Sequence, residues 1–232
     1  PNQTGWDPQL EAAYYHELKQ IGSIKGLEHP FLGKLHGHDD NWFLTHIAPQ
    51  WDYVFTCIPG IMNALGRNTQ FGLASCDTAG RQEALDFMQQ ACTAVAKLNS
   101  HLGRQAVKAV MLQTAPVRDK AVASTDALYQ SLSTMQQWDW QGAQLLIEHC
   151  DAYVPAHAPS KGFLSLSDEI AVLNRLNTVS DEAQKMGIVI NWGRSVFETR
   201  RQEGALEHIT AVQAAGLLSG LMFSGVSDQA TE

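Results

Sequence analysis

The sequence alternates short apolar runs, often rich in β-branched residues, with longer amphipathic segments, and this alternation limits the possible folds more than any other feature. Short apolar runs separated by crossovers of helical length are typical of βα units around a parallel sheet. The runs at 144–148 and 187–191 are apolar almost throughout, as in strands buried on both faces. We predict six strands, at residues 24–28, 52–58, 106–112, 144–148, 187–191 and 218–223.

Helix-start signals lie between these predicted strands. Asp7 followed by Pro8, and Asp77 followed by Thr78, have the residue types preferred at helix N-termini. Gly103 stands where the helix that begins near Asp77 needs a C-terminal cap. Further helices are expected around residues 40–47, 128–135, 167–176 and 206–215.

Two α/β architectures fit this order of elements. An open doubly wound sheet would favour a glycine-rich phosphate loop after its first strand, and neither G-x-G-x-x-G there nor G-x-x-x-x-G-K-[ST] anywhere is present. A TIM-type (β/α) barrel is therefore favoured, with about six of its eight βα units in this chain. No linker or low-complexity segment divides the sequence, so we expect one barrel domain over residues 1–232.

The charge balance limits the partners. The chain has 16 Lys and Arg against 24 Asp and Glu, a formal net charge of −8. Nucleic acids and anionic membranes are bound by clustered basic residues, so we expect neither as a partner. No run resembles a membrane span or a signal peptide, and we expect a cytoplasmic protein. The four cysteines lack metal-site or redox spacing and are expected to be reduced.

Polar side chains directly follow several of the apolar runs. In a barrel the C-terminal ends of the strands form the rim on which catalytic groups gather. Any strand must end in polar loop residues, but charged and amide groups abutting buried strands need partners or a ligand. The rim candidates are Glu28, Gln113, Glu148, His149, Asn191, Trp192 and Arg194.

Glu148 is the strongest of these candidates. It closes an apolar strand and precedes His149, so the pair could hold a hard cation or a sugar hydroxyl. A purely structural ion pair between Glu148 and Arg194 is the alternative. Arg194 could equally bind an anionic group of a substrate, and Trp192 could stack on a sugar ring or plug the barrel.

His36 and His38 form a second cluster with Asp39 and Asp40. Two histidines followed by two aspartates could bind a metal. The favoured interpretation is that an aspartate caps the next helix and that the histidines lie in the preceding loop. Because that loop follows the strand of Glu28, we expect His36 and His38 to overhang the mouth of the pocket and contact substrate.

Four blocks, Gly26–Pro30, Ile147–Ala152, Asn191–Ser195 and Gly220–Gly225, resemble an uncharacterised bacterial family of xylose-isomerase-like TIM barrels, in the sugar phosphate isomerase/epimerase-like superfamily. The resemblance covers nearly the whole chain. It implies that the first and last barrel strands are missing from this sequence, and that loops or another chain, for example in a homodimer, cover the exposed edges.

The resemblance also implies a metal position. Superfamily enzymes hold a divalent ion with acidic and histidine ligands at the rim, and Glu148 matches one of them. Asn191 stands where an acid is usual, and the block ending at Gly225 lacks a histidine. The metal is then either lost or held weakly by Glu148 with Asn191 and Gln113; Mg²⁺, Mn²⁺ or Zn²⁺ is the expected ion.

The leading functional hypothesis is a sugar or sugar-acid isomerase or epimerase with its pocket at the C-terminal ends of the strands. Glu28 and Glu148 would exchange protons next to a carbonyl, while the remaining rim residues and His36 and His38 bind substrate. Two alternatives stay open. One is a non-catalytic small-molecule-binding protein on a degenerate barrel, and the other is a glycoside hydrolase-like carboxylate pair.

Overall fold

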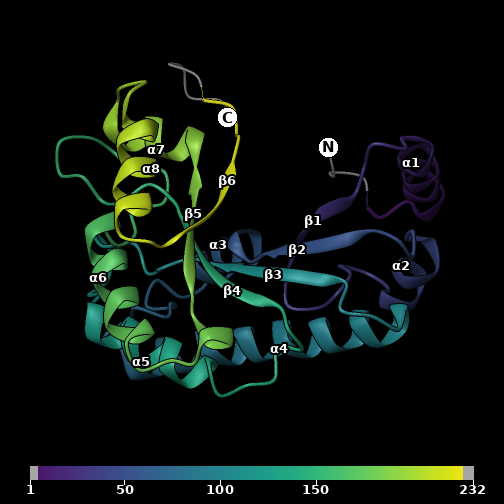
Figure 1. Ribbon diagram of the computed structural model, residues 1–232, viewed down its shortest axis with the longest axis horizontal. Coiled ribbons are helices and arrows are strands. Elements are labelled where there is room, and N and C mark those ends of the chain that lie inside the picture. Colours follow the sequence, from purple (N-terminus) through teal and green to yellow (C-terminus); the bar gives the residue numbers. More distant parts are fainter. Residues whose placement is uncertain (1–4, 227–232) are drawn as a thin grey trace.

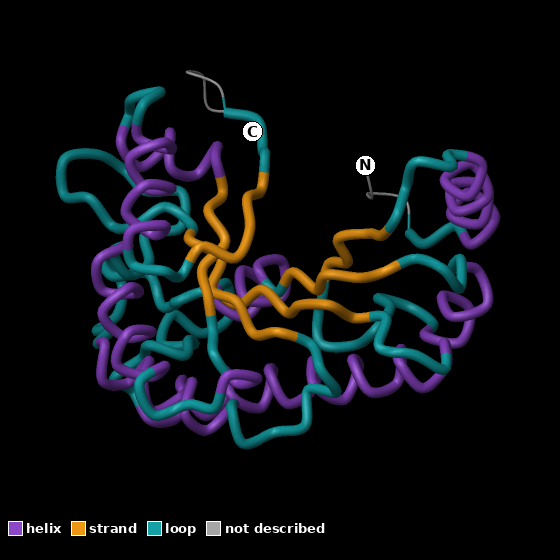
Figure 2. Tube along the Cα trace, viewed as in Figure 1, coloured by secondary structure: helices purple, strands orange, loops and turns teal. Residues whose placement is uncertain are grey.

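The computed structural model describes residues 5–226 and contains one parallel sheet whose six strands lie in sequence order. The sheet curls into an open half-barrel with helices on its convex side (Figures 1 and 2). The expected α/β, TIM-like architecture is confirmed to that extent. The strands are β1 (Gly26–Pro30), β2 (Asp52–Thr56), β3 (Val107–Leu112), β4 (Gln144–His149), β5 (Gly187–Asn191) and β6 (Leu218–Met222).

Helices connect every pair of consecutive strands. The helix α1 precedes β1 and contacts α2, while α7 and α8 together connect β5 to β6. The helices are α1 (Pro8–Gln20), α2 (Asp40–His46), α3 (Ile58–Leu65), α4 (Thr78–Leu102), α5 (Thr125–Met135), α6 (Leu166–Asn177), the short 3₁₀ helix η1 (Glu182–Gln184), α7 (Trp192–Thr199) and α8 (Gly204–Ala214).

Side-chain caps fix the helix starts, as predicted for three of them. Asp7 and Asp77 each accept backbone N–H bonds in the first turn of their helices, and Asp39 does the same for α2. Gly103 ends α4 in the left-handed conformation with φ 65°. Such a backbone conformation favours glycine because it carries no Cβ.

Three predicted strand boundaries are wrong by two residues, and three others differ by one. The second strand ends at Thr56 rather than Ile58, because Cys57 caps α3 and Pro59 lies in its first turn. Proline is tolerated there since the first N–H groups of a helix have no intrahelical partner. The first strand is shifted by two residues at both ends and runs from Gly26 to Pro30.

The two faces of the sheet bury different groups. The main core lies between the convex face and the helices and contains the large aromatic residues, among them Phe43, Tyr53 and Phe55. The concave face has its own smaller apolar cluster, formed by Val54, Ala109, Met111, Leu146, Val189 and Met222. Successive side chains of a strand point to opposite faces, so a residue two positions along the same strand from one of these six also faces the concave side.

Within residues 5–226, β1 and β6 each pair on one side only. In Figure 2 the two edge strands stand on opposite sides of the opening of the half-barrel. No helix among the described residues combines the length and the apolar character that a membrane crossing requires. The described cysteines are all unpaired, and three of the four are buried.

Candidate functional site

Glu148 lies on the concave face at the C-terminal end of β4. It is paired in register with Val189 of the concave cluster, and it is only 3% exposed. Its two carboxylate oxygens accept amide hydrogen bonds, from Gln113 Nε2 at 2.7 Å and from Asn191 Nδ2 at 2.9 Å. Three neighbouring strands thus bring Glu148, Gln113 and Asn191 together, as their positions at strand ends predicted.

The orientation of Asn191 follows from its second role as the N-cap of α7. Its Oδ1 accepts from the backbone N–H of Arg194 at 3.3 Å and from the hydroxyl of Ser224. With the oxygen held on that side, the NH₂ group faces Glu148 and also contacts Met222 Sδ at 3.0 Å. The sequence block at 191–195 is therefore a strand that passes directly into a capped helix.

The neighbours of Glu148 do not fit a divalent metal. A metal ion needs lone pairs from its ligands, whereas Asn191 and Gln113 present N–H donors to the carboxylate. Reversing the Asn191 amide would break the cap of α7. Among residues 5–226, the groups that contact Glu148 therefore do not form the ligand set of the superfamily-type metal position implied by the resemblance.

Glu28 lies on the same concave face, on the edge strand β1. It is in register with Val54 of the concave cluster, and its side chain is exposed. Partial loss of hydration, and next the negative charge of Glu148, raise the pKa of Glu28, while Thr56 lowers it. A carboxyl group with a raised pKa is suited to carrying a proton in general acid–base chemistry.

Two cationic side chains, Arg194 and Lys161, lie near the C-terminal ends of β4 and β5, and Lys161 is within electrostatic reach of Glu148. Arg194, in the first turn of α7, donates to Ser160 Oγ at 2.9 Å and lies 4.0 Å from Asp151 Oδ1. No ion pair joins Arg194 to Glu148 in the described part of the chain, so the alternative prediction of a structural ion pair between these two residues is wrong.

Lys161 is the second cation, and the sequence analysis missed it. It lies in the loop between β4 and α6, where burial and next the charge of Arg194 lower its pKa, opposed in part by Cys150, Asp151 and Glu148. The carboxylate of Asp151 fixes this loop by accepting the backbone N–H groups of Ser160 at 2.7 Å and of Lys161 at 2.8 Å. Nothing in the local sequence marks Lys161, because its position depends on that loop closure.

Trp192 is the first residue of α7 and is half-buried. Its ring lies 5.9 Å from that of Phe223, at an interplanar angle of 32°. The aromatic pair sits at the C-terminal ends of β5 and β6, next to Asn191. Trp192 therefore covers the end of this part of the sheet rather than filling the barrel centre.

His149 does not join the concave cluster. As the residue after Glu148 it points to the convex side, where it is fully buried and bonded to Glu169 on α6 and Glu198 on α7. Burial lowers its pKa, but the two carboxylates, Glu169 first, more than offset this and raise the pKa to about 10. The prediction that His149 contacts substrate in the pocket is therefore wrong, because adjacent residues of a strand point to opposite faces.

His36 and His38 also lie away from Glu148. Both rings pack against Trp6, with centroid distances of 5.6 and 5.0 Å, at the corner between α1 and α2. Nε2 of His36 lies 3.3 Å from a carboxylate oxygen of Glu11. His36 also stacks on Phe43, which contacts the convex-side ring of His29. The two histidines therefore support the α1–α2 corner, and their expected position over the pocket is wrong.

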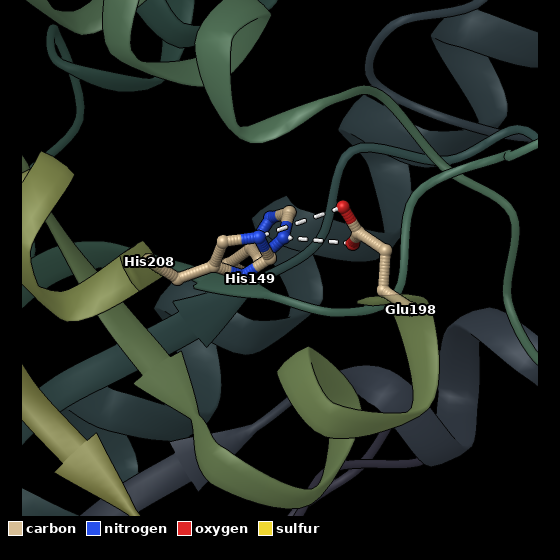
Figure 3. A group of neighbouring side chains, drawn as sticks. All are labelled: His149, Glu198 and His208. Atoms are coloured by element: carbon tan, nitrogen blue, oxygen red, sulfur yellow. Dashed lines mark hydrogen bonds and ion pairs between the residues drawn. The ribbon is translucent and has the colours of Figure 1, made fainter. Parts of the chain in front are cut away.

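The environment of His149 is a second cluster that the sequence did not reveal. Glu198 and His208 meet His149 from α7 and α8 (Figure 3). Glu198 lies 49 residues after His149 in the sequence, so the sequence does not indicate that the two side chains are in contact. Only the packing of the helix pair on the sheet brings the three side chains together.

Sequence comparison places the chain in a family. A family model described as "Domain of unknown function (DUF4862)" matches residues 2–232. The chain belongs to this family. A Salmonella typhimurium (strain LT2) protein named "Uncharacterized protein STM3670" is 34% identical to the DUF4862 chain over 219 residues, which are 94% of this chain and 67% of the relative.

The DUF4862 chain is also similar to a solved structure from Anabaena variabilis ATCC 29413, described as a "putative sugar phosphate isomerase/epimerase". The TM-score is 0.54 at 14% identity, covering 94% of this chain and 67% of the other. At this identity the likeness shows the fold alone. The chain spans about two thirds of the length of both proteins.

Proposed function

We propose that the concave face binds a sugar or sugar acid and catalyses isomerisation or epimerisation, with Glu148 and Glu28 exchanging protons with the substrate. The observation that carries the proposal is that the two carboxyl groups share one face of the sheet, close enough for the charge of Glu148 to raise the pKa of Glu28. The Anabaena protein of the same fold is described by the same class of reaction. The proposal includes membership of the xylose-isomerase-like barrels, which the likeness of fold supports.

The two carboxyl groups have different surroundings, which favours different roles. Glu148 is buried and held by two amide donors, so its position is fixed. As the base it would take a proton from the carbon next to a carbonyl, and the C–H electron pair would move towards the carbonyl oxygen to give an enediolate. Glu28, exposed and with a raised pKa, would return a proton to the enediolate. In isomerisation this proton goes to the former carbonyl carbon, while the hydroxyl proton of the adjacent carbon moves to the former carbonyl oxygen. In epimerisation it goes to the opposite face of the same carbon and the carbonyl re-forms. Exchange with solvent then returns Glu148 and Glu28 to their starting protonation states.

Arg194 and Lys161 supply the positive charge for an anionic substrate. The guanidinium group is suited to bidentate contact with a phosphate or carboxylate. Its bond to Ser160 is made by a partly exposed side chain and can be exchanged for a ligand. Trp192 offers a half-buried aromatic surface beside them, suited to stacking on a sugar ring. The proposed partner is thus a small anionic carbohydrate. We also propose that the protein is located in the cytoplasm.

The test is exchange of substrate hydrogen with solvent. The protein is incubated in D₂O with aldose phosphates, ketose phosphates and keto sugar acids, and deuterium at the carbon next to the carbonyl is measured by NMR. We expect incorporation with at least one compound. Glu148→Gln and Glu28→Gln should each slow it by about 100-fold or more, the usual contribution of a positioned acid or base.

The matched control is Glu17→Gln, which changes an exposed glutamate of α1 and should leave the exchange rate unchanged. Exchange that is unaffected by Glu148→Gln would contradict the proposal.

A binding protein without catalysis is a second candidate, favoured by one observation. Both oxygens of Glu148 are already occupied by amide donors, so the carboxylate is satisfied without a ligand. Saturable binding of a sugar phosphate, measured by calorimetry, with no deuterium incorporation would support this candidate over the enzyme.

A further inference from the structure

The convex side of the half-barrel carries a cluster of side chains that the proposed reaction does not use. His149 ends β4, Glu198 lies in α7 and His208 lies in α8. One ligand atom of each, a ring nitrogen or a carboxylate oxygen, lies within 4.8 Å of those of the other two (Figure 3). They form the one His, Cys, Asp and Glu grouping of this kind in residues 5–226.

The distances within the cluster match those between ligands around a single ion. Nε2 of His149 lies 3.1 Å from Oε2 of Glu198, and Nε2 of His208 lies 3.7 Å from Oε1 of the same carboxylate. Ligands at 2.0–2.1 Å from a tetrahedral zinc ion lie about 3.3 Å apart. The imidazole rings have centroids 5.1 Å apart at an angle of 76°. The three ligand atoms lie within 4.8 Å of one another, so modest side-chain movements would bring them to the spacing of a zinc site.

The ring nitrogens on the far side already have partners. Nδ1 of His149 lies 2.8 Å from a carboxylate oxygen of Glu169, and Nδ1 of His208 lies 3.0 Å from Ser195 Oγ. Glu169 in turn accepts from Thr114 Oγ1 at 2.7 Å. Metal-binding histidines typically use the second ring nitrogen in this way, which fixes the orientation of the ring. Nε2 of His149 is hydrogen-bonded to Glu198 in the folded chain, so it would release its proton to solvent as it binds the ion.

Glu198 is likewise held in place. Its Oε2 accepts the backbone N–H of Ala152 at 2.7 Å. Oε1 faces Nε2 of His208 at a distance too long for a hydrogen bond. An ion pair of His149 with its two carboxylates accounts for His149, but leaves unexplained why His208 also turns its Nε2 to the same carboxylate.

We propose that His149, Glu198 and His208 form a binding site for a divalent transition-metal ion, with Zn²⁺ as the ion that two imidazoles and one carboxylate suit best. The side chains of Glu198 and His208 are 12% and 14% exposed, so an ion can enter from the side of the helix pair. Three protein ligands leave a fourth position for water. The site lies on the opposite side of the sheet from Glu148 and is independent of the proposed reaction.

Such an ion would join β4 to α7 and α8. The same α7 begins at the Asn191 cap and carries Arg194. Binding on the convex side would therefore hold the helix whose first turn borders the concave site. A metal that binds only the folded state stabilises it by mass action.

The test uses the full chain, freed of metal with a chelator and then incubated with excess ZnCl₂. After gel filtration we expect one zinc per chain by elemental analysis, and a higher Tm than that of the metal-free protein. Co²⁺ in place of Zn²⁺ should give the visible absorption of a tetrahedral site. MgCl₂ should produce neither effect, because Mg²⁺ prefers oxygen ligands.

Three variants make the test specific. His208→Gln and Glu198→Gln should abolish retention of zinc through gel filtration. Ser195→Ala, which removes the partner of His208 Nδ1, should weaken affinity by about 10-fold or more. His101→Gln, at an exposed histidine near the end of α4, should retain one zinc and controls for adventitious binding.

The wild-type protein alone can overturn the proposal. If it retains no stoichiometric zinc after gel filtration, or if a correctly folded His208→Gln variant retains as much as the wild type, the site is not a metal site. Neither result bears on deuterium exchange at the concave face, so this proposal and that of the isomerase or epimerase fail separately.

Discussion

At the scale of single residues, the alternation of faces along a strand decided which site residues could be anticipated. Glu148, Gln113 and Asn191 were expected together because polar groups at the ends of parallel strands meet at one rim. His149 was grouped with Glu148 because the two are adjacent. Adjacent residues of a strand point to opposite faces, and the apolar run before them does not show which face is concave.

His29 gives a test of the convex core that depends on one residue. It lies on β1, is 7% exposed, and donates to the carbonyl of Leu35. Burial lowers its pKa from 6.5 to about 4, more than offsetting the effect of that hydrogen bond. The unfolded chain therefore takes up a proton below about pH 6.5, which the folded protein does not bind until about pH 4.

The free energy of unfolding should accordingly fall by up to about 3 kcal/mol from this group as the pH drops between those values. His29→Phe should remove most of this dependence. Urea denaturation at neutral and at mildly acid pH measures it, and His101→Phe at an exposed position is the control. An unchanged pH dependence in His29→Phe would show that the ring is not buried in its neutral form.

At the scale of helices and strands, signals that act through local backbone chemistry were the most reliable. Asp7, Asp77 and Gly103 were correctly placed at helix ends because their preferences depend on a few neighbouring N–H and carbonyl groups. The predicted strand 52–58 stops directly before Pro59, which in fact lies in the first turn of α3. Proline ends a strand and opens a helix equally well, so only the fold decides between these alternatives.

Gly193 tests the packing of α7 against the segment after β6. A Cβ at this position would lie 2.5 Å from Ser224 Oγ and 2.8 Å from the Ser224 carbonyl oxygen. Gly193→Ala should therefore lower the free energy of unfolding by about 1–3 kcal/mol, the usual cost of overpacking. The matched control is Gly220→Ala on β6, where a Cβ would meet Val189 at 3.5 Å, an ordinary contact.

Urea denaturation of the two glycine variants provides the measurement. Because Ser224 also donates to Asn191, Gly193→Ala should disturb the amide that holds Glu148. Equal stability of Gly193→Ala and Gly220→Ala would contradict the close approach of α7 to Ser224.

At the scale of the whole molecule, the number, order and parallel direction of the strands followed from the alternation of apolar runs and helices. The cluster around Glu148 on the concave face and the cluster around His149 on the convex face form only when the sheet curls and the helices pack on it. No local sequence pattern encodes either cluster. Lys161, Glu198 and His208 acquire their neighbours only through loop closure and helix packing. How the outer edges of β1 and β6 are covered stays a prediction.

The central claim is that Glu28 and Glu148, from strands β1 and β4, share the concave face. The most direct measurement is an NMR titration of the Glu28 side-chain carboxyl in the wild type and in Glu148→Gln. Partial desolvation and the charge of Glu148 both raise the pKa of Glu28, so removing that charge should lower the pKa while leaving it above the usual range for glutamate. A Glu28 pKa that is identical in the two proteins would contradict the claim.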